Sequence, residues 1–322
     1  MKLLGLSFGR KMRCGEIMVK EALYKAKEAG AEVEFISTVN MNIGHCKGCD
    51  ACSKVRSRGG QVKCIIKDDY LALEEKVLDA DGIIIAAPVF AVGTVGQFKN
   101  FVDRFGPAHD RASLLEEQKK RIAEGKTGDE LLDPRYFKDR YVGYISVGGA
   151  STQNWVSLGL PMMHLFDMSL HMKAVGHIDA YDQGRRANPV LDQVLMDQCG
   201  ALGKHVAECL GKPYEETEWL GEEGVCPVCH NNLISIGKDM SDKVECPICG
   251  ITGELTVEDH KLKISFSEEQ KNRARCTMNG LYEHYNEIQG MIKVCVPKLM
   301  EHKDTLPKML EKYEKFDELI NQ

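Results

Sequence analysis

Apolar and polar residues follow two alternating patterns over the first 212 residues. Five short apolar runs predict strands, and they lie at residues 2–6, 32–36, 82–87, 141–147 and 175–178. Four segments with apolar residues every three or four positions predict helices, at 16–30, 68–80, 97–105 and 189–210. The run 82–87 is apolar throughout, which is typical of a parallel strand covered on both faces. The order therefore predicts an α/β fold with a doubly wound parallel sheet.

The pattern changes after Gly211-Lys212-Pro213, which is a typical stop signal for a helix. An acidic linker follows, and after it comes a cysteine-containing segment with short β-like runs. The last stretch is charged and amphipathic, and we expect it to form helices that break near Pro297 and Pro307. The sequence divides into three predicted parts. The first is a doubly wound α/β domain at 1–212, with a cysteine segment at 46–64 and a polar insertion at 106–140. A small ribbon-like domain at 221–266 and a helical tail at 267–322 follow. We expect the tail to pack on the body or on a second subunit.

The insertion contains His109, Asp110 and Arg111. We expect these three residues to lie in a solvated loop, with a catalytic role in the wall of a pocket as the alternative.

Composition and charge exclude several classes of protein. The 322 residues are 43% hydrophobic and 28% charged with a net charge of −6, which is typical of a globular chain and not of a disordered one. Residues 225–266 carry four Lys and six acidic side chains, a net charge of 4 − 6 = −2. This balance argues against nucleic acid as a partner.

No stretch of the sequence is suited to crossing a membrane. The longest apolar stretch, 83–95, contains Pro88 and Gly93 and is shorter than the roughly 20 residues that a bilayer requires. The N-terminal residues bring Gly9 and several positive charges before an apolar core of a signal peptide could form. We expect a cytoplasmic protein with no membrane partner.

Eight of the 13 cysteines form two groups of four. The first group has the spacing C-x2-C-x2-C-x11-C and consists of Cys46, Cys49, Cys52 and Cys64. Three thiolates this close together, completed by a fourth from beyond a loop, can hold a [4Fe-4S] cluster. The alternative is that these cysteines hold no cluster.

The second group has the spacing C-x2-C-x16-C-x2-C and consists of Cys226, Cys229, Cys246 and Cys249. Four thiolates at this spacing predict a tetrahedral site for Zn²⁺, with a single rubredoxin-type iron as the alternative. No aromatic residue lies between the first and last of these cysteines. We therefore expect the metal to supply most of the folding free energy of this segment.

Three loops follow predicted parallel strands, where ligands of such sheets bind. The first, at 7–15, offers a hydroxyl, a thiol, three cationic side chains and the free N–H groups of a helix start. These groups can hold a phosphate, or else form an exposed basic turn. The loops at 87–97 and 146–150 are rich in glycine, so a flat ring system could approach their backbones closely.

The ordered motifs CKGCDACS, KCIIKDDY, GIIIAAPVF, GQFKNFVDR and ISVGG, after the strand and serine-led loop at the N-terminus, resemble the NADPH-dependent FMN reductase family, and most closely its iron-sulfur flavoprotein branch. The resemblance covers about the first 180 residues. It implies a flavodoxin-like sheet with strand order 2-1-3-4-5 and a noncovalently bound FMN. The phosphate would lie in the first loop and the isoalloxazine between the other two.

The resemblance, together with the chemistry of the three loops, gives a set of cofactor-binding residues. They are Ser7, Gly9, Arg10, Lys11, Arg13, Cys14, Gly15, Pro88, Val89, Phe90, Ala91, Thr94, Ser146, Val147, Gly148, Gly149 and Trp155. No side chain is assigned as a catalytic acid or base.

We therefore predict an FMN-dependent oxidoreductase that passes electrons between NAD(P)H or ferredoxin, FMN and an iron-sulfur cluster, with a small molecule or a protein as acceptor. One alternative is a flavin reductase that acts directly on a quinone, nitro, azo or unsaturated compound. Another is a redox-sensing docking protein. The resemblance also implies a homodimer or homotetramer.

Overall fold

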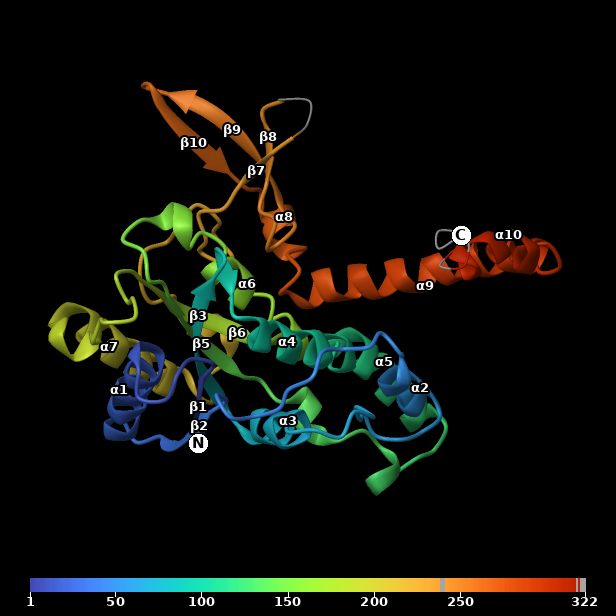
Figure 1. Cartoon of the computed structure of the whole chain (residues 1–322), viewed down its shortest axis with the longest axis horizontal. Helices are drawn as coiled ribbons and strands as arrows, with labels where there is room; N and C mark the ends of the chain where they lie inside the picture. The colour runs from blue at the N-terminus through green and yellow to red at the C-terminus, as the bar shows by residue number, and fades with distance from the viewer. Residues whose placement is uncertain (238–240, 317, 319–322) are drawn as a thin grey trace. The chain divides into compact units, whose positions relative to one another are not determined.

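The computed structural model describes residues 1–237, 241–316 and 318. Its strands are β1 (Lys2–Ser7), β2 (Glu32–Ser37), β3 (Gly82–Phe90), β4 (Gly93–Thr94), β5 (Tyr141–Val147), β6 (Lys173–Ala180), β7 (Ser235–Ile236), β8 (Lys243–Glu245), β9 (Thr252–Glu258) and β10 (Lys261–Ser265). Its helices are α1 (Cys14–Glu28), α2 (Ala51–Ser57), α3 (Tyr70–Asp79), α4 (Gly96–Ala108), α5 (Arg111–Ala123), α6 (Gly159–Met163), α7 (Gln193–Cys209), α8 (Glu268–Asn272), α9 (Met278–Glu301) and α10 (Leu306–Glu314). Figure 1 shows their arrangement.

The main sheet has the order β2-β1-β3-β5-β6, and each neighbouring pair in this order is parallel. The short strand β4 pairs antiparallel with the end of β3 and lies off this path. With β4 set aside, the order is 2-1-3-4-5, so the predicted doubly wound, flavodoxin-like sheet is confirmed. Its carboxyl-terminal edge therefore brings together the loops after β1, β3 and β5.

Two hydrophobic cores cover the two faces of this sheet. Leu4 and Leu6 of β1 pack in the core that includes residues of α3 and α4, whereas Leu3 packs with residues of α1 and α7. Successive side chains of a strand point to opposite faces, so one strand contributes to both cores. At Gly203 of α7 an added Cβ would lie 1.8 Å from the Ala22 carbonyl oxygen, so this close approach to α1 requires glycine.

The insertion at 106–140 is not the solvated loop that we expected around His109 and Arg111. His109 is fully buried and Arg111 is 8% exposed. Arg111 donates hydrogen bonds to the carbonyl oxygens of Tyr136 and Phe137, at 2.6 and 2.5 Å. The expectation was wrong because backbone carbonyls distant in the sequence satisfy the guanidinium inside the protein.

The ribbon segment is a second sheet with antiparallel pairs in the order β10-β9-β8-β7. Its core consists of the four cysteines of the second group with Ile248, Ile251 and Ala274. Trp219 stacks on His230 at 4.0 Å between ring centroids, and Leu220 forms a bridge with Gly176 of β6. These contacts join the ribbon segment to the main sheet.

The contacts divide the chain into one unit at 1–281 and another at 282–322. The finer boundaries at 212, 221 and 266 remain predictions. Within the tail, α9 continues through Pro297 to Glu301, so the break predicted there is wrong, whereas Pro307 lies in the first turn of α10. Residues 291–300 are exposed, so water can solvate the carbonyl that a proline leaves unpaired. Among the residues described, no helix is both long and apolar enough to span a membrane.

Candidate functional site

The first loop connects β1 to α1 and ends at Gly15, where the backbone comes close to β3 and β5. The Ser7 hydroxyl is buried and accepts a hydrogen bond from the Gly9 N–H at 3.3 Å. A Cβ added at Gly15 would lie 3.4 Å from the Ala86 Cβ and 3.5 Å from Val147 Cγ2. Strands β1, β3 and β5 thus meet at the start of α1, where N–H groups are free to bind an anion.

The Cys14 thiol lies beneath this loop. It is 6% exposed and donates to the Ala187 carbonyl oxygen at 3.5 Å. Burial raises the pKa of Cys14, although Arg10 and Arg13 act in the opposite direction. The thiol therefore stays protonated and ties the first loop to the segment after β6.

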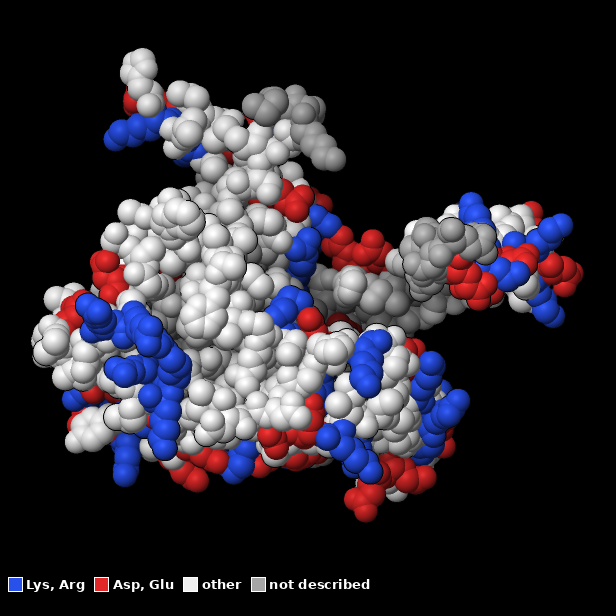
Figure 2. All heavy atoms as spheres, in the orientation of Figure 1, with Lys and Arg blue, Asp and Glu red and all other residues white. Residues whose placement is uncertain are grey.

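Five cationic side chains line a pocket of about 800 Å³ at the first loop: Arg10, Lys11, Arg13, Arg185 and Arg186. Figure 2 shows a group of Lys and Arg atoms over α1. The first three cations were predicted from the sequence. The last two were missed, because they follow the fifth strand of the main sheet and only the adjacent Arg-Arg pair marks them.

The second loop is a tight hairpin at the end of β3. Val89 pairs with Thr94 and Phe90 with Gly93, which leaves Ala91 and Val92 at the turn with φ values of 50° and 73°. A β-branched residue rarely adopts positive φ, so the surrounding contacts must hold Val92 in this conformation. Such backbone strain is typical of binding loops.

The segment that follows the third loop lies against the second loop. The Leu158 N–H donates to the Val92 carbonyl oxygen at 3.3 Å, and Gly93 forms a bridge with Leu158. The Ser146 hydroxyl at the end of β5 is buried, and its partner in the strand register is Asp179 of β6. A hydrogen bond with Ser146 lowers the pKa of Asp179, whereas burial raises it, so the carboxylate is a protein partner for this hydroxyl.

Two large aromatic side chains lie exposed on these loops. Phe90 is 60% exposed and Trp155 is 64% exposed. The exposure of Trp155 rules out the core-packing role that its residue type would also have permitted. Exposed aromatic faces beside glycine-rich backbone are suited to a flat ring system.

The residues of the three loops fit FMN. The cationic pocket and the close approach of Gly15 to β3 and β5 suit a phosphate, and the strained hairpin at Ala91 and Val92 suits the edge of a flat ring. When bound, FMN accepts and donates two electrons with a hydride. The assignment of each individual contact remains a prediction.

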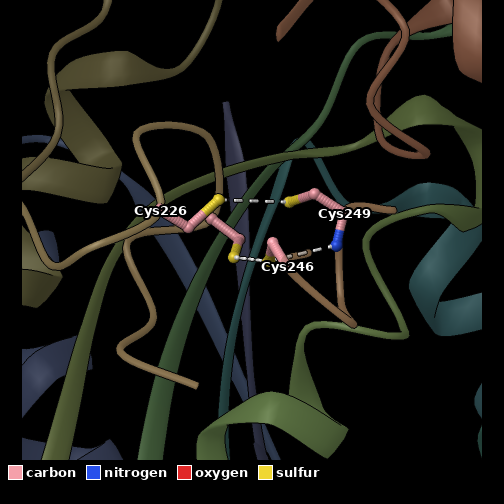
Figure 3. A group of neighbouring side chains, drawn as sticks. Cys226, Cys246 and Cys249 are labelled. Carbon is pink, nitrogen blue, oxygen red and sulfur yellow. Dashed lines mark hydrogen bonds between the residues drawn. The ribbon is translucent and has the colours of Figure 1, made fainter. Parts of the chain in front are cut away.

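The second cysteine group assembles into a compact centre. Its four sulfur atoms lie within 4.8 Å of one another, and all four residues are buried. Figure 3 shows sulfurs of the two Cys-Pro-x-Cys turns directed toward each other. The Sγ–Sγ distances are 3.8 Å for Cys226 and Cys249 and 3.7 Å for Cys229 and Cys246. Four ligands at about 2.3 Å from a tetrahedral ion lie about 3.8 Å apart, so the centre fits a metal.

The first cysteine group is arranged differently. Cys46 and Cys49 are exposed, and Cys52 and Cys64 are half-buried. Over residues 1–237, 241–316 and 318, the second group alone brings four such ligand atoms together. Cys64 Sγ instead accepts a hydrogen bond from Arg104 Nη2 at 3.3 Å. The iron-sulfur cluster predicted here therefore remains a prediction.

Arg104 fixes the segment that carries this first group. Its guanidinium is buried, pairs with Asp68 at 2.6 Å and lies 4.0 Å from the centre of the Tyr70 ring. Burial would raise the pKa of Asp68, but hydrogen bonds from Arg104 and the Gly44 N–H lower it below its ordinary value. Asp68 is thus an ionised partner that holds Arg104 beside Cys64.

Taken together, the sheet and the three loops define a flavodoxin-like nucleotide-binding protein. Residues 1–183 match the NADPH-dependent FMN reductase family. This chain belongs to that family and is an FMN-dependent oxidoreductase.

Two relatives resemble most of the chain. A solved structure described as a flavone reductase is 29% identical, covers 97% of this chain and 97% of its own length, and superposes with a TM-score of 0.79. A flavone synthase of Aspergillus candidus is 26% identical over 250 residues, which are 76% of this chain and 75% of the relative. These likenesses extend beyond the flavin-binding domain.

The iron-sulfur flavoproteins match a shorter part. One from Methanocaldococcus jannaschii is 36% identical over 104 residues, 32% of this chain and 50% of the relative. Another from Methanosarcina thermophila is 35% identical over 132 residues, 41% of this chain and 62% of the relative. The chain thus spans between half and two thirds of these two relatives.

Proposed function

We propose that this protein is an FMN-dependent reductase that transfers hydrogen from a nicotinamide donor to a flavone-type acceptor, a flat aromatic compound with a double bond conjugated to a carbonyl. The observation that carries the proposal is the likeness to the flavone reductase over 97% of both chains. The flavone synthase relative supports the same acceptor class. The two names describe the formation and the reduction of a flavone, so both concern hydrogen exchange with this ring system.

Phe90 and Trp155 supply the surface for such an acceptor. Both rings are more than half exposed. Phe90 lies on the second loop, and Trp155 follows the third loop, the two loops predicted to hold the isoalloxazine. Aromatic faces bind flat apolar rings and exclude water from them. In this role the side chains orient the acceptor so that its double bond faces the flavin.

The reaction balances without a further reductant. The acceptor's double bond takes up a hydride and a proton, and the nicotinamide donor is oxidised. FMN, held by the three loops, would supply the hydride-transfer chemistry between donor and acceptor. The side chains of this site bind and orient the reactants, and the proton comes from solvent or from the acceptor's surroundings.

The second candidate is electron transfer through an iron-sulfur cluster held by the first cysteine group. It is favoured by the cysteine spacing and by the likeness to the iron-sulfur flavoproteins. Ferredoxin would then be a suitable donor. We place this candidate second because the relatives that match most of the chain carry flavone names.

We propose Zn²⁺ for the second cysteine group, in a structural role. All four thiols are buried and form most of the local core, so the ion would be enclosed by protein ligands. Closed tetrahedral thiolate sites of this kind are typical of structural zinc. A single rubredoxin-type iron would fit the same distances and is distinguished by elemental analysis.

We also propose that the protein acts in the cytoplasm as a homodimer or homotetramer. The helix α9 supports assembly, because its apolar side chains follow a heptad spacing yet stay exposed. Ile288 is 44% exposed, Ile292 is 52% exposed and Leu299 is 55% exposed. Ile288 and Ile292 are four residues apart and Leu299 follows seven residues later, and such a spacing is typical of a seam that packs against other helices.

Anaerobic turnover of the FMN-loaded protein tests the function. With NADPH or NADH and a flavone, we expect a product heavier by two hydrogens and a rate that saturates with flavone concentration. Trp155→Ala should raise KM for the flavone by about tenfold, and Cys46→Ser should leave the rate unchanged. Turnover confined to one-electron acceptors and abolished by Cys46→Ser would favour the second candidate.

A further inference from the structure

Two titratable side chains at the end of β6 form a hydrogen-bonded pair. The Tyr181 hydroxyl donates to Asp179 Oδ2 at 2.8 Å. Asp179 also shares a hydrogen bond with the hydroxyl of Ser146, its partner in the strand register of β5 and β6. The three side chains thus form a short hydrogen-bonded chain at the carboxyl-terminal edge of the main sheet.

Backbone hydrogen bonds fix Tyr181 beside the third loop. The Gly148 N–H donates to the Ala180 carbonyl oxygen at 2.8 Å, and the Asp182 N–H donates to the Ala150 carbonyl oxygen at 3.0 Å. These two bonds lie directly before and after Tyr181 in the chain. The tyrosine is therefore held against the glycine-rich loop that is predicted to carry the isoalloxazine.

The pair also lies on the side of the sheet that reaches the second loop. Side chains two residues apart along a strand point to the same side, and the hydrogen bond between Asp179 and Tyr181 keeps them there. On this side, a Cβ added at Gly159 would lie 2.4 Å from Ser146 Oγ and 2.8 Å from Val89 Cγ2. The chain of hydrogen bonds thus begins next to the second loop and ends, at Tyr181, next to the third.

Both side chains are half-buried and hold protons more firmly than exposed ones. Burial raises the pKa of Asp179, although its hydrogen bonds with Tyr181 and Ser146 act in the opposite direction. Burial also raises the pKa of Tyr181, to about 12, and the hydrogen bond with Asp179 adds to this shift. The phenol therefore keeps its proton in neutral solution and gives it up only to a strong base.

We propose that Tyr181 donates the proton in the reduction of the flavone and that Asp179 returns a proton to Tyr181. The inference rests on the proposed function, because it names the proton source for the same acceptor. Hydride addition to the acceptor's double bond leaves negative charge at the carbon next to the carbonyl, which is a strong base. The O–H bond of Tyr181 breaks and a C–H bond forms at that carbon.

The second half of the relay restores the tyrosine. The phenolate oxygen takes the proton of the Asp179 carboxyl across their hydrogen bond, and solvent protonates the carboxylate that remains. The acceptor has then gained one hydride and one proton, and both side chains have returned to their starting state. Ser146 orients Asp179 and takes no part in the proton transfer.

The test uses Tyr181→Phe, which keeps the ring and removes only the hydroxyl. FMN-loaded protein is reduced and mixed with a flavone without oxygen. We expect reoxidation of the flavin to slow by about a hundredfold or more, the usual contribution of a general acid. Reduction of the flavin by NADPH and the Kd of the oxidised protein for the flavone should change by less than about twofold. Tyr24→Phe, at an exposed tyrosine of α1, is the matched control and should react like the wild-type protein.

Isotope labelling separates a proton donor from a side chain that only supports the fold. In deuterated water, the wild-type protein should place one deuteron on a single face of the carbon next to the carbonyl. Tyr181→Phe should label both faces, because solvent then delivers the deuteron. Asp179→Asn should also slow the reaction, and Tyr181→Phe/Asp179→Asn should be no slower than Tyr181→Phe, because the two residues act in one relay.

The two levels of the account fail in different ways. Wild-type protein that reduces no flavone would overturn the proposed function and this inference with it. If the wild-type protein does reduce the flavone, unslowed reoxidation in Tyr181→Phe, or a product labelled on one face only, would overturn the inference alone. Loss of FMN, or a rise in the Kd for the flavone that matches the loss of rate, would also overturn it, because Tyr181 would then serve binding.

Discussion

Each of the two cysteine groups places four cysteines within a short stretch of sequence, but the groups differ in the structure. In the second group, four buried sulfurs lie within 4.8 Å of one another and form the centre of a small core. In the first group, two cysteines are exposed and the other two are half-buried. Arginines hold this first segment in place: Arg104 binds Cys64, and the buried Arg121 donates to the Gly60 carbonyl oxygen at 2.7 Å.

This difference separates two ways of fixing a loop. The ribbon segment buries few apolar side chains besides its cysteines, so thiolates around a metal would take the place of a larger hydrophobic core. The segment at 46–64 lies against a complete α/β domain and can be held by hydrogen bonds from buried arginines without any metal. A cysteine motif therefore indicates a metal that the fold requires only where no hydrogen bonds or apolar contacts hold the segment in place.

Loss of the second centre should have the largest effect. Cys246→Ser removes one of four ligands, and structural zinc sites contribute about 10–16 kcal/mol to folding in small domains. We expect the bound metal to be lost, together with hydrogen-exchange protection at 226–251, as measured by elemental analysis and mass spectrometry. Cys295→Ser, on an exposed position of α9, is the matched control and should keep both. Full metal content in Cys246→Ser would contradict the assignment.

Removal of Arg104 should have the next largest effect. Arg104→Met leaves the Asp68 carboxylate buried without its partner, which costs about 3–5 kcal/mol in comparable cases. Urea unfolding measures the loss, and Arg104→Met/Asp68→Leu should recover part of it because no charge is then left unpaired. A loss below about 1 kcal/mol in the single variant would show that Arg104 does not anchor the first cysteine segment.

Glu74, which accepts a hydrogen bond from Tyr70 at 2.8 Å in the same region, should make stability depend on pH. Burial raises the pKa of Glu74 from 4.5 to about 7. The folded protein therefore favours the protonated carboxyl, and this contribution is complete below pH 4.5 and is lost as the pH rises through about 7.

The expected loss between these limits is about 3 kcal/mol, and it should be absent in Glu74→Gln, whose side chain stays neutral. Urea unfolding of both proteins at pH 5 and pH 8 measures it. Parallel pH profiles for the two proteins would mean that Glu74 titrates normally.

Cys46→Ser/Cys49→Ser should have the smallest effect. Both side chains are exposed, so the free energy of unfolding of protein purified without a cluster should change by no more than about 0.5 kcal/mol. A larger loss would contradict this expectation. If anaerobically prepared wild-type protein also contains iron and sulfide that the double variant lacks, the first group holds a cluster after all. The comparison between the two groups would then need revision.

The strands, the three loops and the ribbon centre could be predicted because their signals are local, whereas the sheet order was implied by the family resemblance. The apolar run at 82–87 predicts a buried strand, and the two Cys-Pro-x-Cys turns predict metal ligands, each from a few adjacent residues. Arg185 and the burial of His109 could not be predicted in this way. The first depends on backbone hydrogen bonds between segments about 30 residues apart, and the second on a core that distant segments complete.

The measurement that tests the central claim most directly is the reaction of the reduced protein with a flavone in the absence of oxygen. FMN-loaded protein is photoreduced, freed of donor and mixed rapidly with a flavone while flavin absorbance is followed. The account predicts that the oxidised flavin spectrum returns as one flavone per flavin gains two hydrogens, at the same rate in Cys46→Ser. Persistence of the reduced flavin with unaltered flavone would contradict it.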